Sequence, residues 1–436
     1  MYPAVLLCFI LTFPSFTQNN WPQFRGKSCG VVTDKTLPIS WDNQKNVLWT
    51  ADIPGRGWSC PVVWGDKIFL TTVASEGQVE EAKKGLYLGG NRNKPSTDTH
   101  HWIVYCFDWN SGEILRQNTV HIGKPAEPVH IKNTYASETP VTDGERVYFY
   151  FGNLGVFCFD LDGNEVWRKQ IDPVKIRYDW GTAISPVLYD NKLFILNDNE
   201  EKSYLLALDT KTGESLFRIE RDEQSNWATP YIWQNNLRTE LITCGSNKVR
   251  SYDMNGKLLW ELGPMSSIVI PTPVEHNDFL YICSGFVGDL KNRPIYAVRP
   301  GASGDISPDD NTPGEYIVWF HKTGGPYNPS PIAYDNYFYV LYDRGTVSCY
   351  DSRTGELVYE KQRLASDAKA FTASPWANDG KLFFLSEDGD TFVVQAGADF
   401  KILSRNPLDE MCMATPATLR GRIIVRTLTK LYCIGE

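Results

Sequence analysis

The sequence has little of the histidine, basic charge and short motifs on which most enzyme and nucleic-acid-binding assignments depend. Its 436 residues include 6 His and 5 Met, and its net charge is −9. An acidic chain lacks the basic face that binds phosphate backbones or anionic membranes, so we expect neither partner. Gly-x-Ser-x-Gly, P-loop, His-Glu-x-x-His and Cys-x-x-Cys motifs are absent, and no catalytic residue can be assigned.

A metal site also lacks a supporting pattern. Residues 160–164 superficially resemble a calcium-binding loop, but Ile171 stands where a bidentate Glu is required. We therefore interpret this stretch as a hairpin turn and expect no metal. The alternative is a metal site built from the histidines of two loops, if these loops meet: His100, His101, His121 and His130.

No two of the ten cysteines are adjacent, and their positions argue against a disulfide framework. Four of them occupy the same place in four similar segments: Cys106, Cys158, Cys349 and Cys433. We interpret these as small buried hydrophobic residues. Three others lie outside that place and have the freedom to pair, although sequence does not decide how: Cys29, Cys60 and Cys412.

What the chain does contain is a repeated β-rich unit, seen most completely in residues 139–169. Four short runs of β-branched and aromatic residues are separated by turns at Asp143-Gly144, Gly152-Asn153 and Asp162-Gly163. This pattern predicts a four-stranded antiparallel meander. One such meander cannot bury both of its faces, so it needs similar neighbours.

A small residue followed by proline opens each repeat, and we call these small residues the heads. They are Cys60, Thr139, Ser185, Thr229, Thr272, Ser330, Ser374 and Thr415. The usual interval of about 40–45 residues is that of propeller blades, and the first and fifth repeats carry extra residues. The sequence therefore predicts an all-β fold, a single eight-bladed β-propeller.

The two ends of the chain complete one blade together in this prediction. After Pro416 there is room for only three strands, and residues 46–50 carry the Val-Leu-Trp pattern of an outer strand. Joining them removes unpaired strand edges. We assign residues 46–436 to the propeller and residues 18–45 to an extension packed on it.

Residues 1–17 are apolar and end in the polar residues 18–20. We interpret them as a signal peptide cleaved near Thr17, which leaves no transmembrane segment. The protein is then expected to be exported to a periplasmic or extracellular location.

Meander geometry brings several loops to one face of the propeller, here called the decorated face. The insertion 75–100, the link 118–134 and the insertion 284–294 all belong to it. The residues just before the inner strands should lie around its central opening and form a site for a planar or sugar-like ligand. The predicted site residues are Arg56, Trp58, Tyr135, Tyr178, Asp179, Trp180, Trp227, Tyr327 and Phe371, with Lys132 and Glu138 as further polar groups. The alternative is that these aromatic rings wedge between blades as a packing rule.

Three segments carry a resemblance to a known family: residues 205–217 (LLALDTKTGESLF), 347–359 (VSCYDSRTGELVY) and 104–115 (VYCFDWNSGEIL). They resemble the pyrroloquinoline-quinone-like (PQQ-like) repeat, in which a Thr-Gly turn and an outer-strand Trp dock neighbouring blades. The resemblance covers nearly the whole chain after Val47. Departures at Leu115-Arg116, Arg299-Pro300 and Ile402-Leu403 predict looser contacts at those blades.

The resemblance implies two functional readings. The family includes quinone-dependent alcohol and sugar dehydrogenases, and also cofactor-free propellers such as the BamB-type outer-membrane assembly factor. The adjacent Cys-Cys pair of the dehydrogenases is missing here, so PQQ with calcium is the alternative. The preferred expectation is a non-catalytic exported propeller that binds an envelope or extracellular protein, peptide or glycan.

Overall fold

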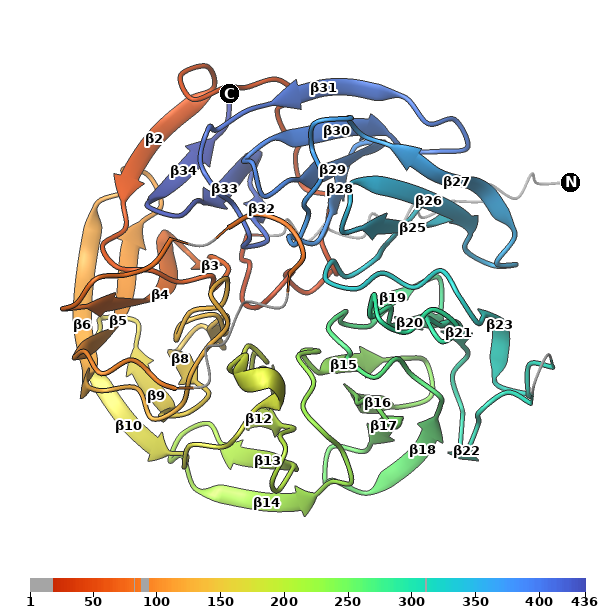
Figure 1. The fold of residues 1–436 in the computed structure, drawn as a ribbon, viewed down its shortest axis with the longest axis horizontal. Coiled ribbons are helices and arrows are strands. Elements are labelled where there is room, and N and C mark those ends of the chain that lie inside the picture. Colours follow the sequence, from red (N-terminus) through yellow and green to blue (C-terminus); the bar gives the residue numbers. More distant parts are fainter. Residues whose placement is uncertain (1–18, 82, 88–93, 310–311) are drawn as a thin grey trace, which may run out of the picture.

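The chain folds into an eight-bladed β-propeller, as the repeats predicted. The computed structural model describes residues 19–81, 83–87, 94–309 and 312–436. Eight sheets are arranged around one central axis (Figure 1). The described residues include a single short 3-10 turn, η1 (Arg177–Asp179), so the all-β prediction is confirmed.

Each blade is an antiparallel meander whose first strand is innermost. The first four blades are β3 (Val62–Trp64), β4 (Lys67–Ser75), β5 (His100–Asp108) and β6 (Ile114–Gly123); β7 (Val141–Thr142), β8 (Arg146–Phe151), β9 (Gly155–Asp160) and β10 (Glu165–Gln170); β11 (Val187–Tyr189), β12 (Lys192–Asn197), β13 (Tyr204–Asp209) and β14 (Ser215–Glu220); and β15 (Tyr231–Gln234), β16 (Thr239–Cys244), β17 (Val249–Tyr252) and β18 (Leu258–Leu262). The next three are β19 (Val274–His276), β20 (Phe279–Cys283), β21 (Ile295–Val298) and β23 (Ile317–His321); β24 (Ile332–Tyr334), β25 (Tyr337–Tyr342), β26 (Thr346–Asp351) and β27 (Leu357–Arg363); and β28 (Trp376–Asn378), β29 (Lys381–Leu385), β30 (Thr391–Gln395) and β31 (Ile402–Asn406).

Blade 8 joins the two ends of the chain. Its strands are β32 (Ala417–Leu419), β33 (Arg422–Arg426), β34 (Lys430–Ile434) and, outermost, β2 (Val47–Asp52). Strand β2 pairs antiparallel with β34, with Val47 opposite Ile434 and Trp49 opposite Cys433. The predicted closure is therefore confirmed, and it leaves no sheet open at the junction of the termini.

Outer-strand tryptophans dock neighbouring blades. Trp167 Nε1 of blade 2 donates a hydrogen bond to the Thr210 carbonyl of blade 3 at 3.0 Å. Its indole lies over Gly213, where φ is +72° and a Cβ atom would come within 2.6 Å of the ring. Trp49 makes the same contact from blade 8 to blade 1, and Trp319 from blade 5 to blade 6. Glycine is needed here both for the left-handed backbone and for the close approach of the ring.

The blades that depart from this pattern are joined in other ways. At the end of blade 1 the stem of Arg116 lies over Gly163, and its Nε donates to the Asp162 carbonyl at 3.1 Å. After blade 4, β22 (Gly304–Asp305) leaves the blade 5 insertion and pairs in parallel with β18. We expected looser contacts at Arg116 and at Arg299-Pro300. At the first position the arginine itself contacts the next blade, and after the second β22 adds a fifth strand to the sheet of blade 4.

Residues 19–45 run across the end of the channel that lies away from the insertion 75–100. Trp21 exchanges two 2.8 Å backbone hydrogen bonds with Val63 of blade 1. Strand β1 (Val31–Val32) then adds in parallel to β28 of blade 7. We call residues 21–32 the floor, because Phe24 forms part of the wall of the central cavity from this side.

All nine described cysteines are free and buried, which confirms the interpretation of Cys106, Cys158, Cys349 and Cys433 as core residues. Burial raises the pKa of the Cys106 thiol to about 11, so it stays protonated and behaves as a small apolar group.

Candidate functional site

A cavity of about 610 Å³ lies on the propeller axis. All eight heads line it: Cys60, Thr139, Ser185, Thr229, Thr272, Ser330, Ser374 and Thr415. Each head begins an edge strand, so its backbone N–H has no strand partner on the channel side. At six of the eight joints between blades that N–H donates to the side-chain hydroxyl of the next head, at 2.9–3.1 Å. The heads therefore form a hydrogen-bonded ring around the channel.

Four of the nine predicted site residues line this cavity: Trp58, Trp180, Trp227 and Tyr327. Two of them are held in place by hydrogen bonds, Trp58 Nε1 to the Lys132 carbonyl at 2.7 Å and Trp227 Nε1 to the Gly181 carbonyl at 2.8 Å. Trp180 lies 5.8 Å from Trp227, measured between ring centroids. The result is a fixed aromatic wall at the decorated face.

Tyr178 and Asp179 lie at the rim of the cavity, in η1. Both have φ of +57°, and the Tyr178 ring, 62% exposed, lies 5.0 Å from Trp180. Arg56 donates from Nη1 to the Glu80 carbonyl at 3.3 Å and thereby contacts the insertion.

The remaining two predicted residues, Tyr135 and Phe371, do not line the cavity. They pack between blades, which was the alternative to a ligand site. Tyr135 lies 5.5 Å from the His100 ring and 6.0 Å from Trp102. Phe371 is 1% exposed and packs against Phe392 in the core of blades 6 and 7.

Residues 83–87 of the blade 1 insertion lie at the mouth of the cavity and contact blade 7. Gly85 N donates to Glu387 Oε2 at 2.8 Å, and Lys132 Nζ lies 2.6 Å from Glu387 Oε1 and 2.9 Å from the Gly85 carbonyl. At the surface Lys84 pairs with Asp388 at 2.7 Å. We call residues 83–87 the strap. The Lys132–Glu387 pair beneath it is buried on both sides, so the strap is anchored by a desolvated ion pair.

Several lining residues were not predicted from sequence. Leu86 and Tyr87 come from the strap, Phe286 from the blade 5 insertion, and Phe24 from the floor. Glu387 lies in the loop between the second and third strands of blade 7. That place, on the decorated face, is the signal from which sequence reasoning could have assigned it to the mouth.

The cavity lining contains cations and no carboxylate among the described residues. Lys132 is neutralised by Glu387, whereas the exposed side chain of Arg344 makes no ion pair with any described residue. Two carboxylates lie behind the wall. Burial raises the pKa of Glu138 to about 7 and that of Asp343 to about 6. Glu138 accepts hydrogen bonds from Gly152 N at 3.2 Å and Thr182 Oγ1 at 2.6 Å.

Nothing in the described ranges supports the four-histidine metal site. No group of three His, Cys, Asp or Glu side chains there is arranged to hold a metal ion. Instead the His130 ring packs between Tyr87 and Trp180, at centroid distances of 5.3 and 5.5 Å.

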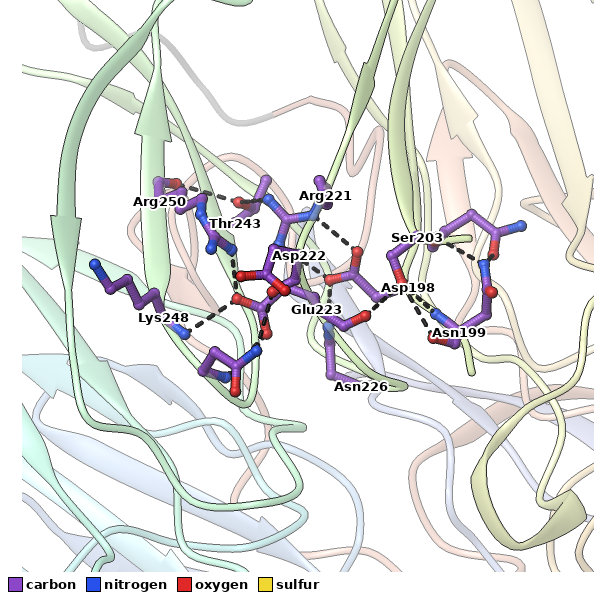
Figure 2. Close-up of polar contacts among 12 residues, drawn as sticks. Asp198, Asn199, Ser203, Arg221, Asp222, Glu223, Asn226, Thr243, Lys248 and Arg250 are labelled. Carbon is purple, nitrogen blue, oxygen red and sulfur yellow. Dashed lines mark hydrogen bonds and ion pairs between the residues drawn. The ribbon is translucent and has the colours of Figure 1, made fainter. Parts of the chain in front are cut away.

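A polar network behind the aromatic wall connects blades 3 and 4 (Figure 2). Arg221 forms a two-pronged pair with Asp198, with Nε–Oδ1 at 2.8 Å and Nη2–Oδ2 at 3.0 Å, and both side chains are fully buried. Arg221 also donates to Thr243 Oγ1 at 2.8 Å, and Asn226 donates to Asp198. The Asp198 carboxylate raises the pKa of Arg221 against the opposing effect of burial. This network fixes the loop that carries Trp227.

The fold and the cavity together define an eight-bladed propeller with a ligand-sized axial site. A family model described as outer membrane protein assembly factor BamB matches residues 100–285. This match covers less than half of the chain, so it shows a similarity of these residues to that family model. No curated protein matches its sequence significantly.

Solved structures share the fold at low sequence identity. BamB from Moraxella catarrhalis is 10% identical, with a TM-score of 0.57 over 88% of this chain and 98% of that one. Quinohemoprotein alcohol dehydrogenase from Comamonas testosteroni is 12% identical, with a TM-score of 0.59 over 96% of this chain and 81% of the other. The computationally designed Ika8 protein is 12% identical, with a TM-score of 0.57 over 89% and 99%. Such likeness establishes the architecture only.

Proposed function

We propose that this protein is an exported, non-catalytic binding propeller. Its axial cavity would hold a peptide or glycan segment presented by an envelope or extracellular partner. The observation that carries the proposal is the cavity itself, about 610 Å³ in volume and lined by seven large aromatic side chains and eight small heads. That volume lies in the range of small-ligand sites. It suits a few side chains or sugar rings rather than a folded domain.

The chemistry of the lining supports the same conclusion. Trp58, Trp180 and Trp227 offer flat apolar faces, on which sugar rings and aromatic side chains stack. Arg344 adds one accessible positive charge, for which a carboxylate on the ligand would be the natural partner.

Exposed apolar side chains around the mouth of the cavity support docking of a larger partner. Tyr178, Val287 and Leu290 are 62%, 43% and 81% exposed, and they belong to loops whose neighbouring residues Trp180 and Phe286 line the cavity. Loops on a rigid scaffold are the usual place for such recognition. The described part of the chain contains no helix long and apolar enough to span a bilayer.

The side chains available as calcium ligands do not support the alternative function, that of a PQQ-dependent dehydrogenase. Calcium sites in proteins are usually built on carboxylates together with carbonyl oxygens and waters, and the described cavity wall offers no carboxylate. Glu387, just behind it, is already engaged by Lys132, Gly85 and Thr372. The residues present therefore do not fit calcium-bound PQQ.

The test is capture of partners from envelope and extracellular fractions, together with a peptide and glycan binding screen, by the wild type and by Trp180→Ala. We expect the variant to lose the specific ligand while keeping its melting temperature, because Trp180 is half-buried. Leu237→Ser, at an exposed hairpin of blade 4, is the matched control and should bind normally. Dye-linked oxidation of alcohols or sugars after reconstitution with calcium and PQQ would overturn the proposal.

A further inference from the structure

A buried cation without an acidic partner lies in the floor. Arg25 is 3% exposed, and its Nη2 donates to the Pro331 carbonyl at 2.8 Å. Its Nε and Nη1 atoms are buried and have no hydrogen-bond partner among the described residues. A guanidinium keeps its charge even when buried, so this arrangement is unfavourable unless a further partner is bound.

The described groups nearest to Arg25 include no carboxylate. Cys29, Tyr231 and Cys283 are its electrostatic neighbours, and burial raises the pKa of Tyr231 and of Cys283 well above the usual value. These two groups therefore stay neutral. Glu275 interacts with the Tyr231 hydroxyl, and no ion pair connects Arg25 to any carboxylate in the described ranges.

A second orphaned group lies beside the same small cavity. Thr272 is 7% exposed, and its Oγ1 has no partner among the described residues. This is one of the two joints that lack the hydrogen bond between heads, since none is found between Thr229 and Thr272 in the described chain. Thr272 and Arg25 both line a cavity of about 20 Å³ between the floor and blades 3 to 5. That volume holds one water-sized species.

We propose that this cavity binds a single monatomic anion, chloride under physiological conditions, between the Arg25 guanidinium and the Thr272 hydroxyl. The three orphaned atoms can all donate a hydrogen bond, and one donor group is charged, which favours an anion over a neutral water. Sulfate and phosphate are too large for the volume. The bound anion would link the floor to the joint between blades 4 and 5, where the hydrogen bond between heads is missing.

The first test is the melting temperature of the full-length protein in sodium chloride and in sodium gluconate at equal ionic strength. A ligand that binds only the folded state stabilises it by mass action, so chloride and bromide should raise the melting temperature in a saturable way, whereas gluconate should not. Sulfate should give only the non-saturating rise expected of a salt excluded from the protein surface. In crystals containing bromide, an anomalous peak should lie beside Arg25 and Thr272. Equal melting temperatures in the two salts, or a water without anomalous signal at this position, would overturn the proposal.

Variants separate anion binding from general stability. Thr272→Val keeps the shape of the side chain and should shift the chloride midpoint by about tenfold, the effect of losing a hydrogen bond to a charged group. Arg25→Gln should abolish the chloride dependence. The matched control is Arg426→Gln, because Arg426 is also buried without a carboxylate partner but donates to Ser59 and lines no such cavity in the described structure. It should melt earlier and still respond to chloride; an unchanged chloride response in Arg25→Gln would contradict the assignment.

Discussion

The two ends of the channel are closed by different kinds of chain, and the difference separates architecture from recognition. The floor is a continuous segment that hydrogen-bonds blades 1 and 7 directly, through Trp21 and β1. The strap lies at the mouth and is fixed chiefly through Glu387 and Asp388. Side chains of the floor are mostly buried, whereas the rim keeps Tyr178 and Leu290 in solvent. We infer that the floor stabilises the ring and that the mouth is the place of ligand entry.

The largest expected effect comes from opening the floor. Trp21 is 1% exposed and belongs to the core cluster shared by blades 7, 8 and 1. Trp21→Ala should lower the free energy of unfolding by about 3–5 kcal/mol, the usual effect of removing a buried indole. Urea denaturation measures the loss, and the folded variant should bind ligand as the wild type does. Unchanged stability would show that the floor does not hold the ring together.

Releasing the strap should be the next largest effect. Glu387→Ala leaves the buried Lys132 ammonium without its partner, and removing one member of a buried pair costs about 3 kcal/mol or more. Asp388→Asn breaks only the exposed pair with Lys84 and should change stability by less than about 1 kcal/mol. Chemical denaturation of both variants tests the contrast, and equal losses would contradict it.

The free energy of unfolding should also depend on pH, because Glu138 is buried behind the wall of the cavity. The pKa of Glu138 rises from 4.5 to about 7 in the folded protein because the group is buried. The folded state therefore holds a proton that the unfolded state has released, and stability falls as pH rises from about 4.5 through about 7. The upper limit is roughly 3 kcal/mol. Glu138→Gln should flatten the stability profile between pH 5 and 8; an unaltered slope would assign the dependence to other groups.

Substitution of the exposed Leu290 should have the smallest effect on stability and a clear effect on partner binding. Leu290 is 81% exposed, so Leu290→Ser should leave the melting temperature within about one degree, since surface substitutions rarely exceed 0.5 kcal/mol. We expect it to weaken docking of a macromolecular partner several-fold. A soluble fragment that only fills the cavity should bind unchanged, and calorimetry with both ligands distinguishes the two.

The sequence predicted the parts of the fold that repeat. Eight heads, the outer-strand tryptophans and the Val47–Trp49 strand each recur at equivalent positions, so each prediction was supported several times within one chain. The floor and strap occur once. No period identifies them, and their positions depend on long-range contacts such as Lys132 with Glu387 and Arg25 with Pro331.

The aromatic residues of the predicted site show why local sequence was insufficient there. Tyr327 and Phe371 both stand three residues before a head, yet Tyr327 lines the cavity and Phe371 is buried beneath Gly345. The length of the preceding link and the neighbour it meets decide between these positions. Neither is visible in the residues around the head.

Hydrogen–deuterium exchange of the free and ligand-bound protein tests the central claim most directly. Binding in the axial cavity should protect the backbone amides of the strap and of residues 284–294, and leave those of the floor unchanged. Protection confined to the outer strands or to the floor, with the strap unaffected, would contradict the assignment of the mouth as the binding site.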